Sequence, residues 1–106
     1  MYDREDPVFA WDGRKARANL AKHGIDFEEA ASVFLDANAL LIADPANSEG
    51  EERFLLLGSS ARFRLLVISH CYRENARVIR IISARKAARQ EARQYLDQAR
   101  PGKGPG

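Results

Sequence analysis

The sequence predicts an α+β domain in which a helical hairpin precedes an antiparallel sheet and one longer helix follows it. Apolar residues recur every three or four positions before residue 35 and after residue 83, which is the period of an α-helix. Between them lie four short segments rich in Leu, Ile and Val, joined by short connections. Such connections suit antiparallel neighbours, so we expect a meander of three to four strands. A length of 106 residues fits one compact domain.

The first third of the chain predicts the two helices of the hairpin. Asp12 is a suitable N-cap for a helix over residues 13–23, and Gly24 suits the left-handed position just past its end. Asp26 is the expected N-cap of the second helix, and Glu29, three residues later, makes the pair close to a capping box. The core face of this second helix consists of Phe27, Ala30, Ala31 and Phe34.

Strands are expected at residues 38–43, 52–59, 63–72 and 77–83. In the last of these, Arg80 shares a face with Val78 and Ile82, whereas the two neighbouring isoleucines point the other way. A charged group among core positions either has a specific partner or lies at a sheet edge, with its stem packed and its head in water. The sequence leaves both possibilities open.

The last helix is expected at residues 84–99, capped by Ser83 and packed on the sheet. Its buried stripe would consist of Ala84, Ala88, Ala92, Tyr95 and Leu96. On another face, Arg85, Arg89 and Arg93 recur every four residues, and an external anion would relieve their repulsion. Arg85 would also lie in the first turn, where backbone N–H groups favour an anion. We assign residues 1–8 to an N-terminal extension, 9–99 to the domain and 100–106 to a disordered tail.

The charge is strongly divided along the chain, although its net value is only +2. Residues 1–53 hold 6 basic and 12 acidic side chains, a balance of −6, whereas residues 54–106 hold 11 and 3, a balance of +8. Of the 17 cations, 13 are arginine, whose planar fork of donors suits phosphate and carboxylate. The basic half indicates an anionic partner, with nucleic acid first and an acidic protein second. A solvated basic face is the alternative.

The sequence predicts no cofactor and no dedicated metal site. Cys71 is the only cysteine, and it forms no zinc-type spacing with His23 or His70. Magnesium held loosely on carboxylates stays compatible with the sequence. No apolar run reaches about 18 residues, and the start MYDREDPV is unlike a signal peptide, so we expect a cytoplasmic protein without a membrane segment.

Three blocks of the sequence resemble the BrnT toxins. FAWDGRKARANLAKHGIDFEEA, residues 9–30, is similar to their opening, and EERFLLLG, residues 51–58, to their second block. VISHCYRENARVIRIISARKAARQE, residues 67–91, resembles the third and most characteristic block. The resemblance covers roughly residues 9–97.

This resemblance implies a RelE-like fold and RNA cleavage that inhibits translation and growth. It also implies a BrnA-type antitoxin with a ribbon-helix-helix DNA-binding region, whose complex with the toxin binds promoter DNA. A toxin dimer or a heterotetramer with antitoxin is the assembly that the resemblance implies.

Metal-free RNA cleavage needs a base for the ribose 2′-hydroxyl, donors for the phosphate oxygens and an acid for the leaving 5′-oxygen. His23 is the first acid–base candidate, although a helix-terminal capping role is the more common one. Packing in the sheet is the commoner role for His70. Glu52, or Glu51 beside it, could serve as a base if desolvated. We reject Cys71 as a nucleophile because no Cys–His–Asp pattern accompanies it.

We expect the basic residues to bind the phosphate groups of the RNA. We name Arg73, Arg80 and Arg85 with His23 and Glu52 as the catalytic set. The predicted RNA-binding residues are Lys22, Arg53, Ser83 and Arg89. Salt bridges to the acidic half are the competing role for each arginine. An endoribonuclease toxin is therefore the first hypothesis, and a non-catalytic nucleic-acid-binding or protein-interaction module is the alternative.

Overall fold

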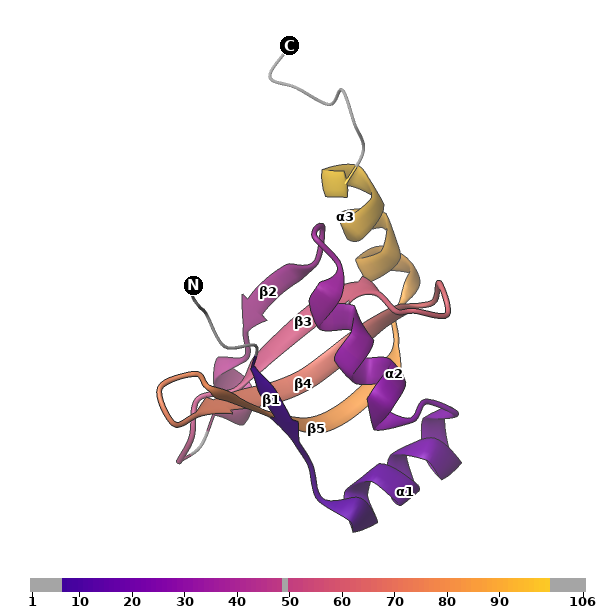
Figure 1. Cartoon of the computed structure of the whole chain (residues 1–106). Helices are drawn as coiled ribbons and strands as arrows, with labels where there is room; N and C mark the ends of the chain where they lie inside the picture. The colour runs from indigo at the N-terminus through magenta and orange to yellow at the C-terminus, as the bar shows by residue number, and fades with distance from the viewer. Residues whose placement is uncertain (1–6, 49, 100–106) are drawn as a thin grey trace, which may run out of the picture.

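The computed structural model describes residues 7–48 and 50–99 and shows an α+β fold built on one five-stranded sheet (Figure 1). The α+β prediction is confirmed. Along the chain the elements are β1 (Val8–Ala10), α1 (Gly13–His23), α2 (Phe27–Ser32), η1 (Val33–Leu35), β2 (Leu40–Ala43), η2 (Pro45–Asn47), β3 (Phe54–Ser59), β4 (Leu65–Arg73), β5 (Val78–Lys86) and α3 (Arg89–Ala99). The strand order across the sheet is β1-β5-β4-β3-β2.

The sheet is mixed and has five strands, so the expected antiparallel meander of three to four strands is only part of it. β2, β3, β4 and β5 follow one another as antiparallel neighbours. β1 adds a fifth strand parallel to β5, with Val8 opposite Val78 and Ala10 opposite Arg80. A three-residue strand carries no recognisable period, and its partner lies far along the chain, so no local pattern indicates it. The predicted tail, residues 100–106, lies outside the described residues.

The last helix begins later than the sequence predicts. β5 continues to Lys86, which pairs with Leu66 of β4, and α3 starts only at Arg89. Ser83 is a strand residue opposite Ser69, so its predicted role as a helix cap is wrong. Strand pairing along the whole of β4 outweighs the helix propensity of an alanine-rich segment.

This shift changes the surroundings of the last arginines and of the predicted stripe. Arg85 lies on β5 rather than in a helical first turn, so it does not stack with Arg89 and Arg93 on one helix face. Ala84 likewise lies on β5. Within α3, Tyr95 is buried, whereas Leu96 is 58% exposed and does not belong to the core.

Both predicted N-caps of the helical hairpin are confirmed. The Asp12 carboxylate accepts hydrogen bonds from the N–H groups of Arg14 (2.8 Å) and Lys15 (3.1 Å), and Gly24 ends α1 at φ +71°. Asp26 accepts the N–H of Glu29 at 2.7 Å. None of the helices among the described residues is long and apolar enough to span a membrane.

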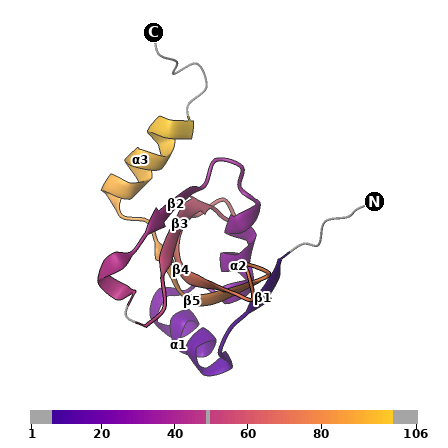
Figure 2. The same cartoon turned by 90° about the vertical axis from the view of Figure 1, so that its left-hand side faces the viewer.

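The sheet carries apolar clusters on both faces, because side chains alternate along its strands. On one face α1 and α2 cover a core around Phe27, Ile68 and Ile81. On the other face α3 packs Tyr95 against Leu57 and Val67. Figure 2 shows α3 set apart from α1 and α2, across the sheet. The second cluster is small and leaves part of its face open.

Asn19 joins α1 to β5 where β1 no longer pairs with that strand. Its side-chain Nδ2 donates to the carbonyls of Ala84 (2.9 Å) and Ile25 (3.0 Å), and its Oδ1 accepts the N–H of Ala84 at 3.0 Å. All three residues are buried. The amide thus satisfies backbone groups of β5 that have no strand beside them.

Glu29 holds the β3–β4 hairpin against α2. Arg64 makes a two-pronged ion pair with this buried carboxylate, and the hydroxyl of Ser60 donates to it at 2.7 Å. The Arg64 side chain is the main reason why the pKa of Glu29 lies below its ordinary value. Glu29 therefore faces the hairpin, and within the described part of the chain no reciprocal bond back to the N-cap completes a capping box.

Asp36 connects the end of η1 to β3 and α3. It accepts the N–H of Ser59 at 2.8 Å and the hydroxyl of Tyr95 at 2.6 Å. Burial and this hydrogen bond raise the pKa of Tyr95 to about 12. Beside it, Gly58 leaves room for no side chain, since an added Cβ would lie 2.9 Å from Val33. This junction fixes Tyr95 of α3 beside η1 and β3.

Candidate nucleic-acid interface

A cleft opens on the sheet face that carries α3. Its volume is about 370 Å³, and it is lined by Asp44, Asn47, Arg53, Leu55, Ser69, Ile82, Ser83 and Arg85. The strand register places the cleft on this face. Arg85, which lines the cleft, lies opposite Val67, and Val67 packs against Tyr95 of α3. Three residues that the sequence singled out, Arg53, Ser83 and Arg85, therefore meet in one place.

An irregularity in the β4–β5 pairing shapes the floor of this cleft. Ser69 lies opposite Ser83, but the next pair is His70 with Ile81, so Ile82 is an extra residue on β5. Such bulges re-aim side chains and recur beside functional sites. Neither serine hydroxyl has a hydrogen-bond partner among the described residues, which leaves both available to a ligand.

Arg85 forms one wall and is held by a carboxylate of α3. Its Nη1 donates to Oε1 of Glu91 at 2.8 Å and its Nη2 to Oε2 at 3.0 Å. The hydrogen bonds from Arg85 are the main reason why the pKa of Glu91 is lowered. The Arg85 side chain is nevertheless 43% exposed, so a ligand in the cleft can reach it.

Arg53 forms the opposite wall, at the entrance to β3. The backbone fixes its position, since its N–H donates to the Ser48 hydroxyl (2.9 Å) and its carbonyl accepts the N–H of Asp44 (2.9 Å). Its Nε is buried and has no hydrogen-bond partner within the described residues. A buried donor without a partner is uncommon and favours a missing acceptor at this position.

Asp44 is the carboxylate that lines the cleft. The Asn47 amide donates to both its oxygens, at 3.3 and 3.2 Å, and this holds it beside the start of β3. Asp44, Asn47 and Ser69 were not predicted as site residues. Ser69 could have been found from the strand register opposite Ser83, whereas the turn that brings Asp44 into the cleft leaves no pattern in the sequence.

A second polar group lies at the other end of β4. Arg73 makes a two-pronged pair with Glu51, with its Nε 3.0 Å from Oε2 and its Nη2 3.3 Å from Oε1. The Arg73 hydrogen bond lowers the pKa of Glu51 and a hydrogen bond from Cys71 adds to this. Burial, with the Glu51 hydrogen bond, raises the pKa of the Cys71 thiol, which disfavours the reactive thiolate.

Arg80 lies opposite Cys71, on the face that the cleft opens on. It also pairs in register with Ala10 of the edge strand β1. Its charge helps to lower the pKa of Asp12, after the larger effect of the Lys15 and Arg14 N–H groups. Arg80 thus lies near the sheet edge, outside the lining of the cleft.

The remaining predicted site residues do not line the cleft. Lys22 and His23 end α1, Glu52 is exposed before β3, and Arg89 is exposed in the first turn of α3. Among the described residues, no group of three or more His, Cys, Asp or Glu side chains is placed to hold a metal ion.

His70 packs in the core. Its ring lies 4.9 Å from that of Phe34, its Nδ1 bonds to the Ile68 carbonyl (3.0 Å), and its Nε2 lies 3.2 Å from the Tyr72 hydroxyl. A carbonyl only accepts, so Nδ1 carries the proton and Nε2 accepts from Tyr72. Burial lowers the pKa of His70 and keeps it neutral, which confirms the expected packing role.

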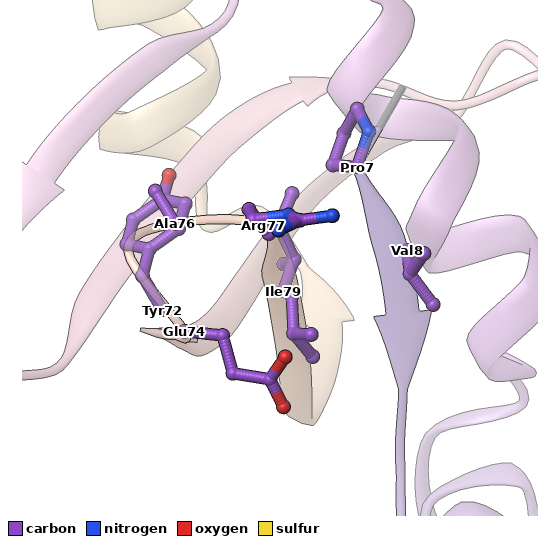
Figure 3. A pocket seen from close by; sticks show the side chains of 8 residues that line it. Pro7, Val8, Tyr72, Glu74, Ala76, Arg77 and Ile79 are labelled. Carbon is purple, nitrogen blue, oxygen red and sulfur yellow. The ribbon is translucent and has the colours of Figure 1, made fainter. Parts of the chain in front are cut away.

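Another hollow, of about 380 Å³, lies at the β4–β5 turn beside the start of β1 (Figure 3). Tyr72, Glu74 and Arg77 line it. Three consecutive residues of the turn, Glu74 to Ala76, have positive φ angles between 51° and 68°. None of the predicted site residues lines this hollow, so the chemistry predicted from the sequence is not gathered here.

The fold and the cleft together define a small α+β protein with arginine and serine side chains on the open face of its sheet. Comparison with known families makes the assignment specific: residues 11–91 match the family described as "Ribonuclease toxin, BrnT, of type II toxin-antitoxin system". The chain belongs to this family, and the resemblance stated from the sequence is confirmed.

A solved structure supports the fold. The chain is similar to the Brucella abortus ribonuclease toxin, BrnT, with a TM-score of 0.62 and 21% sequence identity. The match covers 79% of this chain and 100% of the Brucella chain. No curated protein matches the sequence. Family membership implies an RNA target and an antitoxin partner.

Proposed function

We propose that this protein is a metal-independent endoribonuclease toxin that inhibits translation and growth and is neutralised by a cognate antitoxin. The observation that carries this proposal is the convergence of Arg53 and Arg85 with two unpartnered serine hydroxyls in one cleft of the described residues. Arginine forks and hydroxyl donors are the groups that bind phosphate oxygens. A RelE-like fold and a cytoplasmic location form part of the same proposal.

The reaction is an attack of the ribose 2′-oxygen on the adjacent phosphorus. The bond from phosphorus to the 2′-oxygen forms and the bond to the 5′-oxygen breaks, which leaves a 2′,3′-cyclic phosphate and a 5′-hydroxyl. Negative charge builds up on the non-bridging oxygens between these events. In this proposal Arg53 and Arg85 stabilise that charge from opposite walls, and Ser69 and Ser83 donate from the floor.

The base is proposed to be Asp44, because it is the carboxylate that lines the cleft. It takes the 2′-proton, and the leaving 5′-oxygen takes a proton from water in the open cleft. His23 and Glu52, the candidates named from the sequence, lie outside the lining and stay predictions for the same assay to test. Replacing each of the three separately, by Asn or Gln, decides which one moves the rate.

Beyond the cleft, the proposed role of Arg73 and Arg80 is to hold the RNA backbone on the same face. Lys22 and Arg89 stay predictions for contacts at a greater distance. Losing a phosphate contact weakens binding for all RNA sequences. It also reduces the slope of log binding constant against log salt concentration by about one unit. Arg80→Ala is expected to abolish toxicity while the chain stays folded.

The proposed antitoxin is BrnA-like, with a ribbon-helix-helix region through which the complex binds promoter DNA. A toxin dimer or a heterotetramer is the proposed assembly. We propose that the antitoxin covers Arg80 and Arg85, because an acidic surface would neutralise both at once. Full solvent accessibility of these two arginines in the purified complex would refute that placement.

The deciding experiment incubates the protein with naked RNA in excess EDTA and maps the fragment ends over time. The expected products carry 2′,3′-cyclic phosphates, and Arg53→Ala or Arg85→Ala reduces the rate about 100-fold or more. Arg62→Ala, at the exposed β3–β4 hairpin, is the matched control and retains the rate. Intact RNA both in EDTA and in Mg²⁺ would refute cleavage of free RNA, and binding alone would favour a non-catalytic module.

A further inference from the structure

Glu91 connects the start of α3 to the wall of the cleft. Its Oε1 accepts the N–H of Ala88 at 2.8 Å, which fixes the carboxylate to the first turn of the helix. The same carboxylate receives both Nη groups of Arg85. Because the backbone holds Glu91, the arginine is held in one orientation.

The hydrogen bonds to Glu91 and Lys86 leave one edge of the Arg85 guanidinium unoccupied. Arg85 has five N–H donors, of which Nη1 uses one on Glu91 and one on the Lys86 carbonyl at 3.3 Å. Nη2 uses one on Glu91. The edge formed by Nε and the second Nη2 hydrogen has no partner among the described residues, and this edge can bind two phosphate oxygens in parallel.

We propose that Glu91 is the positioning residue of the cleft, holding Arg85 so that its Nε–Nη2 edge binds the RNA phosphate. This inference rests on the proposed function of the cleft. Arginine side chains lose considerable rotamer freedom when they are fixed, and Glu91 removes that freedom before RNA arrives. Glu91 contacts no RNA in this arrangement and acts only through Arg85.

Helix capping alone does not require this geometry. A cap at the start of α3 needs a single acceptor for the Ala88 N–H, whereas both carboxylate oxygens face the two Nη groups. An inhibitory contact is a different arrangement, in which Glu91 would block the phosphate-binding edge. The open Nε–Nη2 edge argues against it.

The test measures binding of a 2′-O-methyl RNA oligonucleotide, whose blocked nucleophile prevents cleavage, by fluorescence anisotropy. Four proteins form a double-mutant cycle: the wild type, Glu91→Ala, Arg85→Ala and the double variant. We expect Glu91→Ala to weaken binding about tenfold, but less than about twofold when Arg85 is already absent. Asp97→Ala, which removes another exposed carboxylate from α3, is the matched control and leaves binding unchanged.

Glu91→Gln separates positioning from capping. Its carbonyl oxygen still accepts the Ala88 N–H and one Nη1 hydrogen of Arg85, but the charge is lost and the amide nitrogen, a donor, faces Nη2 in place of an acceptor. We expect the melting temperature to stay close to that of the wild type while binding weakens as in Glu91→Ala. Binding equal to wild type would refute positioning by the two-pronged ion pair.

The outcomes separate the two proposals. Equal losses from Glu91→Ala in the presence and absence of Arg85 would overturn positioning, and tighter binding by Glu91→Ala would show an inhibitory contact instead. Either result leaves the cleavage assay on unmodified RNA unaffected. If the wild type neither binds nor cleaves RNA, the proposed function itself fails, and the inference fails with it.

Discussion

Replacing Asn19 by alanine should destabilise the protein by about 3 kcal/mol. The change leaves three buried backbone groups without their partner: the N–H and the carbonyl of Ala84 and the carbonyl of Ile25. Each such group costs about 1–3 kcal/mol, and water entering the vacated space holds the total near the lower end, about 3 kcal/mol. Domains of this size are stable by about 5–15 kcal/mol, so the loss is a large fraction.

Urea unfolding measures this loss directly. The midpoint should fall while the slope stays constant, because the same surface is exposed on unfolding. Asn38→Ala is the matched control, since its exposed side chain makes no hydrogen bond among the described residues, and it should shift stability by less than about 0.5 kcal/mol. A loss below about 1 kcal/mol for Asn19→Ala would refute the claim that this amide stands in for a missing strand.

Three further predictions concern the packing around α2, η1 and α3. Gly58→Ala should lower the free energy of unfolding in urea by about 1–3 kcal/mol, because the new methyl collides with Val33; an unchanged midpoint would mean that η1 can yield. The pKa of Glu29 is lower in the folded protein than in the unfolded chain, where it is near 4.5, so the ionised carboxylate stabilises the fold. This stabilisation is complete above the unfolded-state pKa and is lost as the pH falls through the folded-state pKa. Melting temperatures across that range should therefore fall more steeply for the wild type than for Arg64→Ala, and parallel curves would contradict the ion pair. Tyr95→Phe should cost about 1–2 kcal/mol in urea and remove the tyrosine absorbance change centred near pH 12, and a wild-type titration of Tyr95 centred near pH 10 would contradict the hydrogen bond.

Local chemistry made the helical hairpin predictable, and long-range pairing made the rest of the fold difficult to predict. Asp12 and Asp26 each cap the helix that directly follows them, so a few adjacent residues were enough to predict where both helices begin. The segment after Ser83 reads as a helix by itself. It is a strand as far as Lys86 because β4 supplies partners from another part of the chain.

The candidate site shows the same division. The arginine-rich composition predicts phosphate binding in general, but the specific argument for Arg85, a place in the first turn of the last helix, was wrong because Arg85 lies on β5. The meeting of Arg53 and Arg85 in one cleft depends on the register between β4 and β5 and on the turn after β2, neither of which leaves a local signal. Glu91 was missed for a related reason: as a helix residue six positions from Arg85, it reaches that arginine only because a strand ends between them.

The position of β5 in the sheet also sets the order in which the protein can fold during synthesis. This strand is the last of the five to leave the ribosome, yet it lies between β1 and β4. β1 therefore waits without a partner until nearly all of the domain has emerged, and such non-local pairing is slow. Arg85 is carried by this same strand, so the two walls of the cleft meet only in a nearly finished chain. In the proposed function, RNA cleavage therefore starts only after β5 has paired with β4.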